Sequence, residues 1–86
     1  MPVVYGMNHA SAPLTVRERV AFPEPVIRDA VVRLRRTAGV EEALILSTCN
    51  RTELIVSMQP DEAPGTLARF LASERPISRD ELERHC

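Results

Sequence analysis

Two short apolar segments separated by six polar residues dominate the middle of the chain. Residues 43–46 (Ala-Leu-Ile-Leu) are apolar on both faces of a strand, and residues 53–58 form a second, less regular apolar segment. This pattern predicts two strands joined as a hairpin, with residues 47–52 as its polar corner. A strand that is apolar on both faces is typical of a central position covered by helices. We therefore expect residues 43–46 to be the central strand of a sheet.

Three further segments predict the main elements around this hairpin. Residues 3–7 are β-branched and aromatic, which favours a strand. Residues 25–38 repeat apolar side chains at helical spacing, and Gly39 follows as the left-handed residue that ends many helices. A helix of about two turns is predicted within residues 65–73.

Two shorter helices are predicted from capping boxes, in which a Ser or Thr and a Glu three residues later satisfy each other's backbone amides. Thr15 and Glu18 would open a short helix over residues 16–21. Ser78 and Glu81 would open a last helical segment that runs into the C-terminus.

The predicted order is strand, helix, strand, strand, helix, with a trailing helical turn. This order indicates an α+β fold, a ferredoxin-like βαββα(β) sandwich that lacks its final strand. A missing last strand leaves an open sheet edge, which proteins normally cover or blunt. We therefore expect residues 1–86 to be part of a longer protein.

Composition excludes several classes of function. With three glycines, the chain contains no G-x-G-x-x-G or Walker loop, so any nucleotide is expected to bind elsewhere. All 11 cationic residues are arginine, which excludes Schiff-base chemistry on a lysine. The net charge of −1 argues against a strongly basic nucleic-acid binder. No apolar run is long enough to cross a membrane and no signal peptide precedes the first strand, so we expect a cytoplasmic chain with no membrane partner.

Cys49 is the residue in the hairpin corner with the most reactive side chain. A lone cysteine is most often a small buried hydrophobe, but Cys49 lies among polar neighbours. Arg51 places a fixed positive charge two residues away, which favours the nucleophilic thiolate. The amides and hydroxyls of the corner are candidates to stabilise an oxyanion. The residues alone leave an inert loop thiol and a nucleophile as equal alternatives.

Two motifs make the chain similar to a known family. Ser-Thr-Cys-Asn-Arg-Thr-Glu at residues 47–53 closely resembles the signature of glutamyl-tRNA reductase. Gly-Met-Asn-His at residues 6–9, Ala-Pro at 12–13 and Val-Arg-Glu-Arg-Val-Ala-Phe at 16–22 also resemble that family, in its order and spacing. Ala10 and Ser11 depart from the basic residue and threonine that are usual there, which leaves the nucleophile untouched.

The resemblance implies a reaction and roles for four residues. The family reduces glutamyl-tRNA to glutamate-1-semialdehyde with NADPH, the committed step toward tetrapyrroles. By this likeness Cys49 attacks the glutamyl ester and forms a thioester, which hydride then reduces. Arg51 would pair with a carboxylate of the glutamyl group, and Thr48 and Asn50 would position the substrate.

The same resemblance implies where the remaining parts of the enzyme lie. Residues 1–86 would be the N-terminal portion of the catalytic domain, and the NADPH-binding and dimerisation domains would lie outside it. The implied partners are glutamyl-tRNA, a second copy in the homodimer and the downstream aminotransferase.

The alternative is a stand-alone ferredoxin-like module that binds RNA or an anion without catalysis, since such folds host many functions. The two histidines do not decide between these alternatives. His9 fits best as a loop histidine bonded to nearby backbone, and His85 does not correspond to the family's downstream histidine. We expect no metal site, because His9, Cys49, His85 and Cys86 lack the spacing of zinc ligands.

Overall fold

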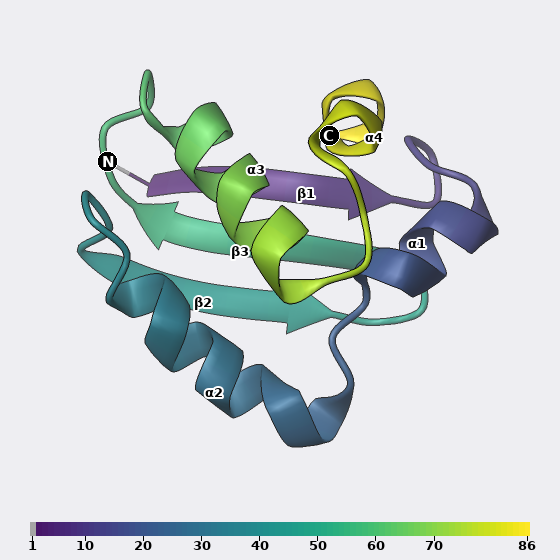
Figure 1. Ribbon diagram of the computed structural model, residues 1–86, viewed down its shortest axis with the longest axis horizontal. Helices are drawn as coiled ribbons and strands as arrows, with labels where there is room; N and C mark the ends of the chain where they lie inside the picture. Colours follow the sequence, from purple (N-terminus) through teal and green to yellow (C-terminus); the bar gives the residue numbers. More distant parts are fainter. Residues whose placement is uncertain (1) are drawn as a thin grey trace.

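The computed structural model describes residues 2–86 and confirms the α+β class (Figure 1). Residues 2–86 form a three-stranded antiparallel sheet combined with four helices. In chain order the elements are β1 (Pro2–Asn8), α1 (Leu14–Val20), α2 (Glu24–Arg35), β2 (Glu42–Ser47), β3 (Arg51–Ser57), α3 (Ala63–Glu74) and α4 (Arg79–His85). α1 lies at the end of the sheet where β2 turns into β3, and α3 passes in front of β3 (Figure 1).

The sheet has the order β1-β3-β2, so β3 is the central strand. β3 pairs with β1 from Asn8 opposite Arg51 to Pro2 opposite Ser57, and with β2 from Ser47 opposite Thr52. The prediction that residues 43–46 form the central strand is therefore wrong. Ile45 faces the core, whereas Leu44 on the other face of β2 is 57% exposed. The apolar residues of β2 therefore form one buried face and one exposed face.

The helices follow the predicted pattern with shifted ends. The helix predicted over 25–38 ends as α2 at Arg35, and Gly39 adopts the left-handed conformation (φ 90°) in the turn before β2. The helix predicted within 65–73 is confirmed and is longer, because it begins at Ala63 with Pro64 in its first turn. The Ser78 box is confirmed, since Ser78 Oγ accepts from the Glu81 amide at 3.2 Å.

The capping box predicted at Thr15 is wrong. The N-cap of α1 is Pro13, with no side-chain cap, and the Pro13 carbonyl accepts from the amides of Val16 and Arg17 at 3.1 Å each. The proline ring fixes φ near the observed −67°, so the helix begins one residue before Thr15. Thr15 therefore lies inside the first turn.

The core is mainly aliphatic and lies between one face of the sheet and the helices. Alternate side chains of β3 (Thr52, Leu54 and Val56) point into it. Its largest fully buried side chains are Met7, Val20, Leu34, Leu54, Leu67, Leu71 and Leu82. On the opposite face of the sheet, Val4 and Leu44 are more than half exposed. No helix in residues 2–86 has the length and apolarity that a membrane crossing requires.

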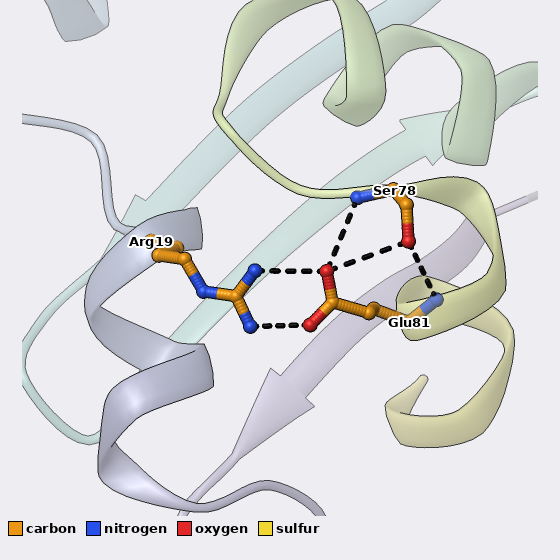
Figure 2. Close-up of polar contacts among 3 residues, drawn as sticks. All are labelled: Arg19, Ser78 and Glu81. Atoms are coloured by element: carbon orange, nitrogen blue, oxygen red, sulfur yellow. Dashed lines mark hydrogen bonds and ion pairs between the residues drawn. The ribbon is translucent and has the colours of Figure 1, made fainter.

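Two pairs of charged side chains connect the helices. Arg19 of α1 forms a two-pronged ion pair with Glu81 of α4, and the same carboxylate accepts from the Ser78 amide and hydroxyl (Figure 2). Arg33 of α2 binds Glu74 of α3 in the same way, at 2.8 and 2.6 Å. Since both contacts join residues far apart in sequence, they fix the helices relative to one another over the core.

Gly6 in β1 is required by a close backbone approach. A Cβ at this position would lie 2.0 Å from the Thr52 carbonyl oxygen, whereas a Cβ at Gly65 in α3 would have nothing within 4 Å. We expect Gly6→Ala to lower the free energy of unfolding by about 3 kcal/mol, because two paired strands must separate. The matched control Gly65→Ala should raise it by about 0.5–1 kcal/mol, because alanine favours helix. Urea unfolding of both variants measures this, and a Gly6→Ala variant as stable as wild type would contradict it.

The contact between Arg19 and Glu81 predicts a dependence of stability on pH. Hydrogen bonds from Arg19, aided by those from Ser78, lower the pKa of the Glu81 carboxyl from 4.5 to about 2. Because the pKa is lower in the folded state, the stabilisation is complete above pH 4.5 and is lost as the pH falls toward about 2. We expect the difference in unfolding free energy between wild type and Glu81→Gln to shrink across this range.

Urea unfolding at a series of pH values tests this prediction. Glu83→Gln is the control, since Glu83 is an exposed carboxylate on the same helix. The difference in unfolding free energy between Glu83→Gln and wild type should stay small over the whole pH series. A Glu81→Gln difference that does not change between neutral and acidic pH would rule out the assigned linkage.

Candidate active site

The corner between β2 and β3 is a tight turn shaped by Thr48. The Thr48 amide donates to the Arg51 carbonyl at 2.8 Å, and Thr48 Oγ1 accepts from the amides of Asn50 and Arg51 at 3.2 and 3.3 Å. The connection is therefore three residues, 48–50, and shorter than the predicted polar corner. Three amides of the turn are engaged within it, so these groups are not free to stabilise an oxyanion.

Ser47 and Thr52 at the base of the hairpin face inward. Thr52 is 2% exposed, and its hydroxyl lies 3.2 Å from Ser47 Oγ. Ser47 Oγ also accepts from the Phe22 amide at 2.9 Å, in the segment that joins α1 to α2. These two hydroxyl groups therefore join the two strands at the base of the hairpin and attach this base to the segment between α1 and α2. The sequence signal that identifies them is the alternation of Thr52 with Leu54 and Val56, which sets all three on the inner face.

Cys49 lies at the tip of the turn with a free, exposed thiol. The interpretation of Cys49 as a small buried hydrophobe is therefore wrong. Its carbonyl accepts from Arg17 Nη1 of α1 at 2.9 Å, and Arg17 Nε donates to the Ala12 carbonyl at 3.1 Å. The sequence motifs do not assign Arg17 to the site, because the contact joins residues 32 positions apart.

Arg51 begins β3 with a side chain that is 47% exposed. Its Nη1 lies 3.5 Å from Glu53 Oε1 two residues along, on the same outer face of the strand. An exposed pair at this distance is weak, and a guanidinium has five N–H donors. The Arg51 side chain therefore has hydrogen-bond donors left for a further anion.

The other candidate residues lie away from this turn. His9 is exposed in the turn after β1, and His85 Nδ1 lies 3.0 Å from the Ser11 carbonyl, which attaches α4 to that turn. The Cys86 thiol packs near the Tyr5 hydroxyl, and burial raises the pKa of this thiol. Within residues 2–86, no three His, Cys, Asp or Glu side chains are placed to hold a metal ion.

An open hollow of about 410 Å³ lies at the opposite end of the sheet from the turn. It is lined by Gly39 before β2 and by α3 residues that include Gly65 and Arg69. Neither glycine belongs to a glycine-rich phosphate loop. The structure places Thr48, Cys49 and Asn50 on one turn and Arg51 at the start of the strand that follows it.

Comparison with known proteins identifies the family. The profile of the family "Glutamyl-tRNAGlu reductase, N-terminal domain" matches residues 5–86. The chain is 47% identical to a glutamyl-tRNA reductase of Rubrobacter xylanophilus over 81 residues, which is 94% of this chain and 19% of that protein. It is 46% identical to the Marinobacter nauticus enzyme over the same shares of each chain. The identity is 53% over 66 residues with the Aromatoleum aromaticum enzyme, or 76% of this chain and 16% of that one.

The chain spans about a fifth of the length of these relatives. The match covers both sequence motifs, the second half of β1 and every element from α1 to α4. The chain therefore belongs to the glutamyl-tRNA reductase family and corresponds to the N-terminal domain of that enzyme.

Proposed function

We propose that this domain carries the nucleophile of a glutamyl-tRNA reductase, in the N-terminal portion of the catalytic domain. The observation that carries the proposal is the exposed thiol of Cys49 at the tip of the turn, two residues before Arg51 in the sequence. An inert structural cysteine is normally buried among apolar side chains. The family match and the motif at residues 47–53 support the same substrate class.

The step that we assign to this chain is an acyl transfer. The Cys49 thiolate attacks the carbonyl carbon of the glutamyl ester, a C–S bond forms, and the C–O bond to the tRNA breaks. The tRNA leaves as a ribose hydroxyl after taking up a proton. The product is a glutamyl thioester on Cys49.

We assign the reductive half of the reaction to residues outside this chain. NADPH bound by those residues would supply the hydride, and the C–S bond to Cys49 would break as the aldehyde is released. The described residues do not fit a dinucleotide, since Gly6 lies against a neighbouring strand and Gly65 is inside α3. The chemistry of this domain therefore ends at the thioester.

We assign recognition of the glutamyl group to Arg51, Asn50 and Thr48. A planar guanidinium binds a carboxylate through two parallel hydrogen bonds, and the weak contact with Glu53 leaves Arg51 donors available. Asn50 is exposed next to Cys49. Thr48 Oγ1 accepts from two turn amides, so its hydroxyl proton is the group left for the substrate.

The strand order supports the ferredoxin-like sandwich as the complete fold. In that plan a fourth strand pairs with the outer edge of β1, which has β3 on its other side. We propose that later residues of the full protein supply this strand, the nucleotide-binding domain and the dimer contacts. The same proposal includes the aminotransferase as the partner that takes up the reactive aldehyde, in the cytoplasm.

The role of Cys49 predicts the behaviour of two cysteine variants in the full-length reductase. We expect Cys49→Ser to lower the rate of tRNA release from glutamyl-tRNA by at least about a thousandfold, because the hydroxyl does not replace the thiolate. Cys86→Ser is the matched control and should keep wild-type activity, since Cys86 follows α4 and is not part of the turn. Wild-type tRNA release in Cys49→Ser would refute the mechanism, because Cys49 would then not be the nucleophile.

The role of Arg51 predicts a change in substrate affinity. Arg51→Lys keeps the charge and loses the two-pronged contact, so we expect KM for glutamyl-tRNA to rise by about tenfold. Arg69→Lys, at an exposed arginine of α3, is the control and should leave KM unchanged. Steady-state kinetics of the full-length enzyme measure both, and an unchanged KM in Arg51→Lys would remove Arg51 from substrate recognition.

A further inference from the structure

We infer that Arg17 of α1 is a positioning residue that holds the backbone of Cys49, and through it the thiol, in the orientation needed for attack. This inference rests on the proposed function, since it assigns Arg17 a role in the step that Cys49 performs. It concerns a side chain that approaches the turn from another element and carries no reacting atom itself.

The geometry begins with the two carbonyl groups that Arg17 connects. Nη1 donates to the Cys49 carbonyl at 2.9 Å, and Nε donates to the Ala12 carbonyl at 3.1 Å. Ala12 is 5% exposed and belongs to the core. The guanidinium is therefore fixed on the buried side by Ala12 and presents its outer nitrogen to the tip of the turn.

The turn needs this contact because its own hydrogen bonds are internal. The bonds of Thr48 with Asn50 and Arg51 fix the shape of the turn. They do not fix the direction in which the turn leans relative to the helices, because both ends of each bond move together. Within residues 2–86, the hydrogen bond from Arg17 joins the backbone of residue 49 to a different element.

A second contact fixes the base of the same hairpin to the same region. The Phe22 amide, two residues after α1, donates to Ser47 Oγ at 2.9 Å. The hairpin is therefore held to the α1 segment at its base through Ser47 and at its tip through Cys49. With the base already attached, the bond from Arg17 acts mainly on the orientation of the tip.

The chemistry of the contact requires arginine. Two carbonyls in different directions are bound by the Nε and Nη1 atoms of one rigid plane, whereas a lysine ammonium is a point charge on a flexible stem. A lysine at position 17 retains the charge near the turn and one of the two hydrogen bonds. A glutamine loses the charge and the reach.

The experiment compares Arg17→Gln and Arg17→Lys with Arg19→Gln in the full-length reductase. Arg19 lies on the same helix and binds Glu81 and not the turn, so its loss destabilises α1 without touching Cys49. The measured quantities are the rate of tRNA release at saturating glutamyl-tRNA without NADPH, the KM and the melting temperature.

We expect Arg17→Gln to lower the rate of tRNA release by about tenfold or more, because a small misplacement of a nucleophile is costly. Its KM should stay within about twofold of wild type, and Arg17→Lys should recover part of the rate. Arg19→Gln should lower the melting temperature and leave the rate within about twofold. If Arg17→Gln does not fold, the rate of tRNA release in Arg17→Lys is compared with the rate in Arg19→Gln. A lower rate in Arg17→Lys supports the inference, and equal rates refute it.

A wild-type rate in the Arg17 variants, or equal loss in the Arg17 and Arg19 variants, would overturn the inference. A separate readout distinguishes this failure from failure of the proposed function. If Cys49→Ser still releases tRNA, the proposed function fails, and alkylation of Cys49 by iodoacetamide in a Cys86→Ser background then tests Arg17 alone. A change of more than about threefold in the alkylation rate of Cys49 in Arg17→Gln but not in Arg19→Gln supports positioning. Equal alkylation rates in the two variants refute it.

Discussion

The pairing of β3 on both sides is the constraint on which the rest of the structure depends. β1 and β2 each match β3 residue by residue along most of its length, and neither pairs with the other. The inner face of β3 supplies Leu54 and Val56 to the core, and its outer face presents Arg51 and Glu53. One strand therefore sets the position of the core and the position of the charged groups.

The two-residue period of a strand divides the hairpin motif into two functional halves. Ser47 and Thr52 face inward at the base of the turn, whereas Arg51 faces outward and Cys49 is exposed. A motif of seven consecutive residues therefore contains both the proposed nucleophile and the structure that holds it. Thr48 belongs to both halves, because its backbone closes the turn and its side chain binds two of the turn's amides.

Local features of the sequence predicted local structure, and contacts over long separations lay beyond it. The hairpin, the left-handed Gly39 and the Ser78 capping box depend on neighbouring residues and were predicted. The box at Thr15 failed because Pro13 begins the helix with its own carbonyl. The central strand was assigned wrongly because apolar faces do not reveal which strand pairs on both of its edges. The position of Cys49 on an exposed turn agreed with its polar neighbours, whereas the Arg17 contact depends on where α1 lies at the end of the sheet (Figure 1).

The close approach at Gly6 also bears on how the sheet avoids misfolding. A slip of β1 by one residue would bring Tyr5 or Met7 to the place where the Thr52 carbonyl leaves room for hydrogen alone. The same slip would turn the buried Met7 side chain toward the open face. Steric exclusion and loss of burial thus both disfavour a one-residue slip of β1. The correct register of β1 against β3 keeps residues 47–53 next to α1.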